Sequence, residues 1–216
     1  MHSNRMTDKF DFNDGNGPVP AHQHSNGGGW VAETADVADT VYVWPEAMVY
    51  SHAWIYGDAR IYGDAKVYGY ARVSENAVVL DDVKVYGDAE ISGNAEVFGD
   101  ALVFANPLIS GNAVVFEHAE VYGNAKIYGD AKISGDAKVS GNVKIFQNAD
   151  VSENATVFGN SRVSGNAKVY GYAWVYGYAT IFGNSRVSGD ARIFGDAEVY
   201  GNAKVSGNAK VSGEDG

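Results

Sequence analysis

A six-residue repeat without a single insertion or deletion governs most of this chain. From residue 31 to residue 216 the sequence divides into 31 consecutive units, and each unit begins with Val or Ile. The third residue is Gly in 21 units, and the fifth is Ala in 24. A period of six does not match the 3.6-residue period of an amphipathic helix, and a Gly in every turn would cost a helix about 1 kcal/mol each. The repeat therefore excludes a helical fold for residues 31–216.

Each unit predicts one short strand and one corner. The β-branched first residue suits a strand and points inward. Gly followed by Asn or Asp suits a tight turn, because these residues tolerate positive φ, and the small fifth residue fits where the backbone bends close to the core. Strand alternation turns the second and sixth residues outward. The sequence therefore predicts an all-β fold, a single-stranded β-solenoid over residues 31–216. The Pro- and Gly-rich residues 1–30 are expected to form an N-terminal cap or arm, and Glu214 and Asp215 to keep other strands from pairing with the last unit.

The repeated pattern Val/Ile-x-Gly-Asn/Asp-Ala-x resembles hexapeptide-repeat left-handed β-helices, and in texture it is most similar to YdcK-type β-solenoid proteins. The resemblance covers 186 of the 216 residues. It implies three units per triangular coil, and hence about ten coils stacked about 4.8 Å apart. Residues 1–30, with Phe10 to Pro20 and His22 to Trp30, resemble the leaders that precede such repeats in uncharacterised proteins of tailed bacteriophages. This second resemblance implies a phage or prophage source.

Composition and charge exclude several classes of function. The chain has no Cys, which removes disulfides, thiolate nucleophiles and Cys-ligated metals. Sixteen Lys and Arg against 27 Asp and Glu leave a net charge of −11, so direct binding to nucleic acid or to anionic lipid is not expected. No apolar run approaches the roughly 20 residues of a membrane span, and the polar N-terminus does not predict a signal peptide. We expect a cytoplasmic protein, in the bacterial host if it is phage-encoded.

The resemblance also raises the possibility of acyl transfer, because many hexapeptide-repeat proteins are acyltransferases that use a His as general base. The candidates are His52 and His118, both at the corner position of their units, and Glu117 and Glu120 lie near enough in sequence to orient the imidazole of His118. Such enzymes usually interrupt their coils with a loop that helps to build the site. Because the repeat here is uninterrupted, we favour solvated corner histidines and assign no catalytic residue and no cofactor.

Two patterns suggest metal ions only weakly. His22 and His24 alternate in the N-terminal segment, but two ligands without a third do not define a site. With three units per coil, one corner carries a row of Asp residues that could hold Ca²⁺ or imitate phosphates, and we favour solvated side chains there. The row consists of Asp64, Asp82, Asp100, Asp136 and Asp190. A second corner carries amides that can bond along the rod, at Asn76, Asn94, Asn112, Asn148, Asn166, Asn184 and Asn202. No metal is assigned.

The outward aromatic residues are the least ordinary feature of the sequence. Sorting the units by threes places eight rings on one face, at Tyr50, Tyr68, Tyr86, Phe104, Tyr122, Phe158, Tyr176 and Phe194. Such a stripe either stabilises the solenoid by stacking or forms an interface. Its densest point has five rings in nine residues around one corner, with Arg192 one coil beyond Trp174 and within cation–π reach. The predicted binding residues are Tyr170, Tyr172, Trp174, Tyr176, Tyr178 and Arg192.

Three functions follow as alternatives. The first is a non-enzymatic binding or structural module that self-associates along its aromatic face into a homotrimer or dimer. The second is a hexapeptide-type acyltransferase. The third is a viral anti-defence protein that acts by acidic mimicry of nucleic acid, or by sequestering a host protein or a small ligand. The sequence favours the first, because an uninterrupted rod offers surface rather than a pocket.

Overall fold

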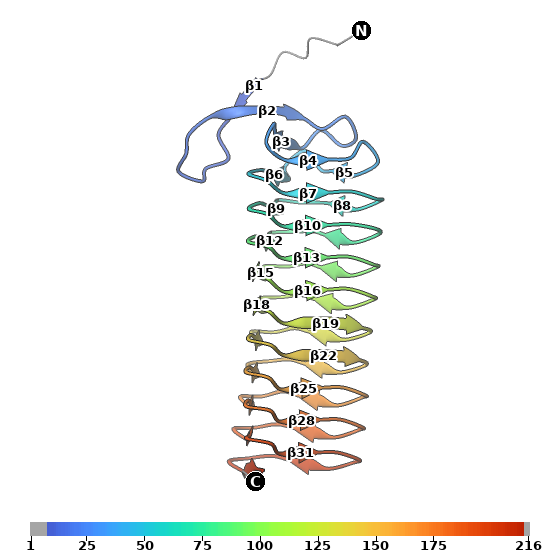
Figure 1. Ribbon diagram of the computed structural model, residues 1–216, viewed down its shortest axis with the longest axis vertical. Helices are drawn as coiled ribbons and strands as arrows, with labels where there is room; N and C mark the ends of the chain where they lie inside the picture. The colour runs from blue at the N-terminus through green and yellow to red at the C-terminus, as the bar shows by residue number, and fades with distance from the viewer. Residues whose placement is uncertain (1–7, 214–216) are drawn as a thin grey trace.

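The chain winds into a rod of stacked three-sided coils (Figure 1). The computed structural model describes residues 8–213, so the charges expected at Glu214 and Asp215 lie outside the described residues. Within residues 8–213 every regular element is a β-strand, which confirms the predicted all-β solenoid of about ten coils. None of these residues belongs to a helix that could cross a membrane.

The strands form three parallel-stacked sheets, which we call faces 1, 2 and 3. Face 1 contains β1 (Asp8–Phe10), β2 (Val19–Gln23), β3 (Trp30–Ala32), β6 (Met48–Val49), β9 (Lys66–Val67), β12 (Lys84–Val85), β15 (Leu102–Ala105), β18 (Glu120–Gly123), β21 (Lys138–Val139), β24 (Thr156–Val157), β27 (Trp174–Val175), β30 (Arg192–Phe194) and β33 (Lys210–Ser212). Face 2 contains β4 (Asp36–Val37), β7 (Trp54–Ile55), β10 (Arg72–Val73), β13 (Glu90–Ile91), β16 (Leu108–Ile109), β19 (Lys126–Gly129), β22 (Lys144–Gln147), β25 (Arg162–Val163), β28 (Thr180–Ile181) and β31 (Glu198–Val199). Face 3 contains β5 (Tyr42–Val43), β8 (Arg60–Ile61), β11 (Val78–Val79), β14 (Glu96–Val97), β17 (Val114–Val115), β20 (Lys132–Ile133), β23 (Asp150–Val151), β26 (Lys168–Val169), β29 (Arg186–Val187) and β32 (Lys204–Val205).

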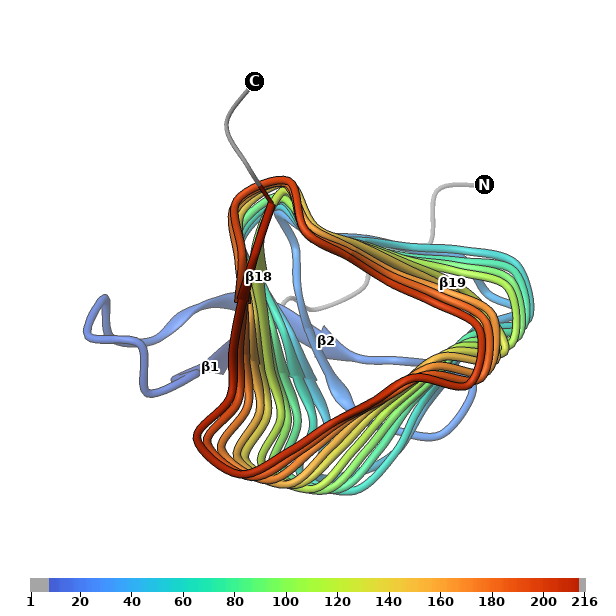
Figure 2. The ribbon, with the colours of Figure 1, turned by 90° about the horizontal axis from the view of Figure 1, so that it is seen from below.

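From β3 onward each strand pairs in parallel with the strand one coil later, so that Arg72, for example, lies opposite Glu90. Three units therefore make one coil, as the resemblance implies. Figure 2, seen from the C-terminal end, shows a triangular outline in which the chain runs clockwise as it approaches the viewer, from β18 on one side to β19 on the next. A chain that turns this way is a left-handed solenoid. We call the corner after face 1 the first corner, the corner after face 2 the second, and the corner after face 3 the third.

The core is made from the first and fifth residues of the units. Val or Ile at the first position is buried on every coil from Val43 to Ile193, and the fifth residue lies beside it, fully enclosed. Two buried serines replace Ala at the fifth position without leaving an unpaired hydroxyl. Ser161 Oγ donates to the carbonyl oxygen of Phe158 at 3.0 Å, and Ser185 Oγ donates to that of Phe182 at 2.9 Å. The interior is therefore apolar along the rod, and chemistry is confined to the outer surface.

The third residue of each unit makes the corner by adopting a left-handed backbone conformation. At every third position from Ser51 to Gly207, φ lies between +60° and +80°, whether the residue is Gly or not. The next residue then donates its N–H to a carbonyl oxygen of the following coil, as Asn94 does to Gly111 at 2.7 Å. The predicted tight turn is present, and its positive φ belongs to the third residue rather than to the Asn or Asp at the fourth.

The N-terminal residues extend face 1 by two antiparallel strands. β2 pairs with β3 so that His22 lies opposite Val31, and β1 pairs with the other edge of β2. Phe12, in the turn between β1 and β2, packs on Tyr50 with ring centroids 4.9 Å apart. Ala32 occupies the outward position at which the next coils have Tyr50 and Tyr68. Because Ala is small, it leaves room for the ring of Phe12. Phe12 thus supplies from the cap the ring that the first coil lacks.

Candidate binding surface

A ladder of stacked aromatic rings runs along face 1, as the repeat predicts. Neighbouring ring centroids are 4.8–5.3 Å apart, and within the solenoid the ring planes are inclined by less than 10°. The first run comprises Phe12, Tyr50, Tyr68, Tyr86, Phe104 and Tyr122, and the second comprises Phe158, Tyr176 and Phe194. Ser140 separates the two runs.

Stacking covers the faces of these rings and leaves mainly their edges to solvent. Tyr50 is the most enclosed, with 6% of its surface exposed beneath the cap. Burial raises the pKa of Tyr50, and the neighbouring Tyr68 and Asp14 add to the effect. Burial likewise raises the pKa of Tyr68. The ladder is therefore in the first place a structural element, whose rings stabilise one another without a partner.

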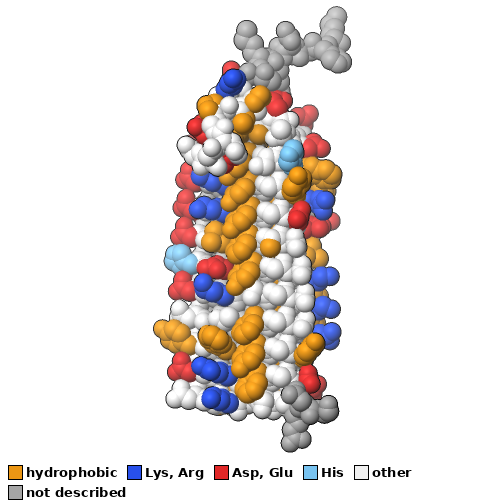
Figure 3. Space-filling view, turned by 60° about the vertical axis from the view of Figure 1, so that its left-hand side comes forward, with side chains coloured by type: hydrophobic (Ala, Val, Ile, Leu, Met, Phe, Trp, Pro, Cys, Tyr) orange, Lys and Arg blue, Asp and Glu red, His pale blue; other side chains and the backbone are white. Residues whose placement is uncertain are grey.

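Beside the second run of the ladder, exposed rings widen the stripe into a patch. Figure 3 shows the apolar stripe along the rod and further apolar side chains beside it toward the C-terminal end. Trp174 is 44% exposed, and its ring meets Phe158 edge to face at 6.1 Å. The Arg192 guanidinium lies over Trp174 at 5.5 Å, as the offset of one coil predicts. We call the group the Trp174 patch; it contains Phe158, Tyr172, Trp174, Tyr176, Arg192 and Phe194.

The structure spreads the predicted binding residues over two faces and two corners. Tyr172 projects from the third corner at 62% exposure, and Tyr178 projects from the first corner at 67%. Tyr170 is half-buried on face 3. Six residues of extended chain separate the two exposed tyrosines and span up to about 20 Å. The expectation that all five rings surround one corner is therefore wrong, because a unit of six residues contains a whole side of the triangle. Only Tyr172, Trp174, Tyr176 and Arg192 belong to one surface.

A second aromatic cluster near the N-terminal end was not predicted from the sequence. Trp54 on face 2 is 50% exposed, and the Arg72 guanidinium lies over it at 5.2 Å. At the preceding corner His52 stacks on Tyr70 with centroids 5.3 Å apart. The signal was present as a Trp followed by an Arg 18 residues later, the same spacing as Trp174 and Arg192. Among the described residues, the exposed large apolar side chains before Tyr172 all precede Arg72, so the middle coils separate the two clusters.

The carboxylates beside His118 are not the two that the sequence suggests. Its Nε2 lies 3.3 Å from Asp100 Oδ2 and its Nδ1 lies 3.5 Å from Asp136 Oδ1, one coil to either side along the third corner. Glu117 instead accepts a hydrogen bond from the backbone N–H of Gly135 at 2.5 Å. Glu120 pairs with Lys138 at 3.0 Å and raises the pKa of that lysine. The expectation that Glu117 and Glu120 orient His118 is wrong, because neighbours along the rod are closer than neighbours in sequence.

The histidines of the N-terminal segment are engaged in the cap. His22 lies in β2 and pairs through Nδ1 with Glu33 Oε1 at 2.6 Å, whereas His24 is 4% exposed and contacts the backbone of Asn26. Over residues 8–213, no three His, Cys, Asp or Glu side chains are placed to share a metal ion. The Asp side chains in the row on the third corner are likewise not placed to share a metal ion.

The predicted amide ladder is present on the second corner, and a similar one lies on the first. On the second corner each Asn donates Nδ2 to the next side chain at 2.9–3.4 Å, and Asp130 accepts where the Asn row is interrupted. On the first corner the ladder runs through Asn106, Asn124, Asn142 and Asn160. These rows fill the middle coils with polar side chains that bond one another.

Part of the repeat matches a known family of repeats. Residues 161–177 match the family described as the YdcK Beta solenoid repeat. The chain is a hexapeptide-repeat β-solenoid. No curated protein sequence matches it.

Three similar solved structures are UDP-N-acetylglucosamine acyltransferases. The Francisella novicida structure has a TM-score of 0.49 and 13% identity, and the alignment covers 82% of this chain but only 66% of that one, just under two thirds. For the Moraxella catarrhalis UDP-N-acetylglucosamine O-acyltransferase the TM-score is 0.41 at 13% identity, covering 82% of this chain and 71% of that chain. The Campylobacter jejuni protein has a TM-score of 0.35 and 14% identity, and the alignment covers 70% of this chain and 67% of that chain.

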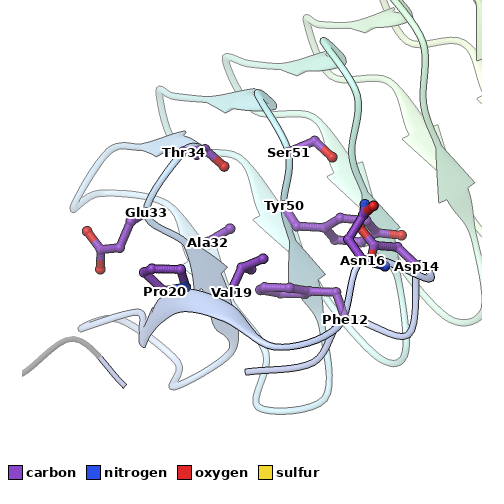
Figure 4. A pocket seen from close by; sticks show the side chains of 10 residues that line it. All are labelled: Phe12, Asp14, Asn16, Val19, Pro20, Ala32, Glu33, Thr34, Tyr50 and Ser51. Carbon is purple, nitrogen blue, oxygen red and sulfur yellow. The ribbon is translucent and has the colours of Figure 1, made fainter. Parts of the chain in front are cut away.

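One small cleft opens between the cap and the first coils of the solenoid (Figure 4), with a volume of about 320 Å³. Its apolar wall includes Phe12, Val19 and Tyr50, and Asp14 and Asn16 lie at the edge of the Tyr50 ring. Hydrogen bonds from Asn16 lower the pKa of the Asp14 carboxyl. The cleft is the joint at which the cap turn rests on the aromatic ladder.

Proposed function

We propose that this solenoid is a non-enzymatic binding module that associates with a second copy of itself through the Trp174 patch. The observation that carries the proposal is the exposure of Trp174 and Tyr172 beside a stacked Arg192, continuous with the second run of the ladder. Trp, Tyr and Arg are the residues that contribute most binding energy at protein interfaces. The Trp174 ring loses little conformational entropy on binding, because Arg192 and Phe158 already hold it in place.

The distribution of charge supports a second copy as the partner. Residues 157–213, which include the whole patch, contain six Lys or Arg and three Asp or Glu. Residues 8–156 contain nine Lys or Arg and 22 Asp or Glu. The rod therefore has a basic C-terminal part and a long acidic part. Two copies laid antiparallel bring unlike parts together, and electrostatic complementarity of this kind favours one orientation over another.

The antiparallel arrangement also matches charges along one edge of face 1. A two-fold axis across the rod places the third corner of one copy over the third corner of the other, with the direction reversed. When this axis crosses face 1 near the middle of the rod, Arg192 and Lys210 approach the acidic end of that corner in the second copy, which contains Glu46, Asp64 and Asp82. A parallel pair would instead place the two acidic parts side by side.

Sedimentation velocity tests the proposal. We expect the protein to form dimers at micromolar concentration and the double variant Tyr172→Ala, Trp174→Ala to sediment as a 23.0 kDa monomer. Tyr70→Ala is the matched control, because it removes a ring of similar exposure, 61%, from another part of the rod, and it should still dimerise. A monomeric wild type, or equal losses in the double variant and the control, would overturn the proposal.

The non-enzymatic part of the proposal has its own test. Incubation with acyl-CoA donors and amine or hydroxyl acceptors should release no free thiol above the rate without protein. Turnover that disappears in His118→Ala would show that the third corner is catalytic, and the function would then be acyl transfer.

A further inference from the structure

A row of three cations on face 2 stands apart from the Trp174 patch. Lys126, Lys144 and Arg162 occupy the sixth position on consecutive coils, directly opposite one another in the sheet register. Adjacent strands are about 4.8 Å apart, and like charges placed opposite one another destabilise a sheet. The row therefore opposes folding unless something neutralises it.

Within residues 8–213, no carboxylate lies within ion-pair distance of these three side chains, whereas Lys138 and Lys168 each have one. Lys138 pairs with Glu120 at 3.0 Å and Lys168 with Asp150 at 3.8 Å. On face 1 two other aligned lysines share a groove with the acidic third corner; it is lined by Asp64, Lys66, Asp82, Lys84 and Asp100, together with Met48 and Leu102. The corner beside the face 2 row carries amides instead, so this row has neither an ion pair nor an acidic corner next to it.

The row borders a groove whose lining suits an anion. The groove has a volume of about 370 Å³ and is lined by Asn142, Lys144, Asn160, Arg162, Tyr178 and Thr180. This volume lies in the range of small-molecule sites, about 300–1,000 Å³. Two cations, two amides and two hydroxyl-bearing side chains line it without a carboxylate.

The amide ladder adds a hydrogen-bond donor at the end of this groove. Each Asn donates Nδ2 to the Oδ1 of the next, and Asn142 donates to Asn160 at 3.0 Å. Because the ladder runs in one direction, its last donor is Asn160 Nδ2, which has no acceptor among the described residues. The next side chain on this corner is Tyr178, 67% exposed. The groove thus combines fixed positive charge, a free amide donor and an accessible ring.

We propose that this groove binds an oligophosphate, independently of the self-association proposed above. Arg162 binds one phosphoryl group through two parallel N–H donors, and Lys144 binds the next from the neighbouring coil. Asn160 Nδ2 donates to a phosphoryl oxygen, and Lys126 extends the row by one more coil. The same phosphate chemistry occurs in inorganic triphosphate and in nucleoside triphosphates. Only a nucleotide would also use Tyr178, by stacking its base on the ring.

Calorimetric titration with sodium triphosphate tests the proposal. We expect saturable binding to the wild type and a loss of affinity of about tenfold or more in Arg162→Gln and in Lys144→Gln, because each loses a charge-assisted contact. Lys84→Gln removes the same charge from face 1 and should change the affinity less than about twofold. The absence of binding at millimolar triphosphate, or an equal loss in Lys84→Gln, would overturn the proposal, since the second result would mean that only the overall charge matters.

A second set of measurements distinguishes a nucleotide ligand from inorganic triphosphate. It also separates triphosphate binding from the self-association proposed above. If the ligand is a nucleotide, Tyr178→Ala should weaken the binding of ATP and leave the binding of triphosphate unchanged. If the wild type binds ATP and triphosphate with equal affinity, the ligand is the inorganic triphosphate chain. The double variant Tyr172→Ala, Trp174→Ala should bind triphosphate as the wild type does. Thermal unfolding gives an independent readout: triphosphate should raise Tm for the wild type and not for Arg162→Gln.

Discussion

At the scale of single residues, the corner conformation explains both the Gly and the exceptions to it. Seven of the third positions with positive φ are not Gly. Four of them use their side chains to accept a hydrogen bond from the N–H of the third residue one coil further on. These pairs are Asp81 with Gly99, Glu117 with Gly135, Gln147 with Gly165, and Glu153 with Gly171. A left-handed conformation costs a non-Gly residue roughly 1–2 kcal/mol, and a hydrogen bond to an exposed N–H offsets part of that cost.

The corner conformation predicts opposite effects for two substitutions that have no such hydrogen bond. Gly111 has φ +73°, and a Cβ added there would lie 2.9 Å from the backbone nitrogen of Gly129. We expect Gly111→Ala to lower the free energy of unfolding by about 1–2 kcal/mol through the left-handed conformation alone. Ala105 already has φ +69°, so Ala105→Gly should stabilise the protein or leave it unchanged. Urea unfolding followed by circular dichroism measures both, and a destabilised Ala105→Gly would contradict the argument.

At the scale of elements, the 18-residue coil places like residues on like. This stacking is favourable for rings, which pack face to face along face 1, and for amides, which are donors and acceptors at once. It is unfavourable for charges, as the row of Lys126, Lys144 and Arg162 shows. A ladder in this fold is therefore stable by itself when it is aromatic or amide, and requires counter-charges when it is ionic.

The gap in the aromatic ladder provides a direct test of its contribution. Ser140 lies between Tyr122 and Phe158 in the row, so Ser140→Tyr should join the two runs and create two new ring pairs. We expect stabilisation of about 1–3 kcal/mol, at roughly 0.5–1.5 kcal/mol per pair. Ser92→Tyr is the control, because its neighbours in the corresponding row of face 2 are Ser74 and Ser110. Differential scanning calorimetry should show a higher Tm only for the first variant; equal shifts would mean that stacking contributes little.

At the scale of the whole molecule, the two aromatic clusters and the two charge regimes make the rod asymmetric from end to end. The basic coils contain the Trp174 patch, whereas the acidic coils contain the cap and the Trp54 cluster. An object of this kind has one electrostatically preferred way to lie against its own copy. In the proposed dimer the apolar patch would provide affinity, and the charges would provide orientation and the rate of encounter.

Self-association should therefore weaken as salt is added. The Debye length falls from about 10 Å at 0.1 M to about 3 Å at 1 M ionic strength, so attraction between the acidic and basic parts is screened. We expect the dimer dissociation constant from sedimentation equilibrium to rise severalfold between these conditions. Sodium sulfate at matched ionic strength is a useful comparison, because it strengthens apolar burial. A dissociation constant that falls with sodium chloride would contradict the antiparallel charge match.

Much of this protein could be predicted from the period of six, because every unit repeats one local conformation. The inward Val and Ile, the rings on face 1, the amide row and the contact between Trp174 and Arg192 all follow from that period once three units make a coil. The cap was harder to predict, because β1 and β2 pair through backbone groups that carry no periodic signal, and because Phe12 reaches its place on Tyr50 from outside the repeat.

The sequence by itself determined the path of the backbone and which side chains face outward, since these depend on local sterics and alternation. Only the tertiary structure decided which outward groups meet, because contacts here join residues 18 apart more closely than residues two or three apart. That is why His118 contacts Asp100 and Asp136 rather than Glu117 and Glu120. It is also why five rings close in sequence are spread over two faces and two corners, and why three cations distant in sequence form one row.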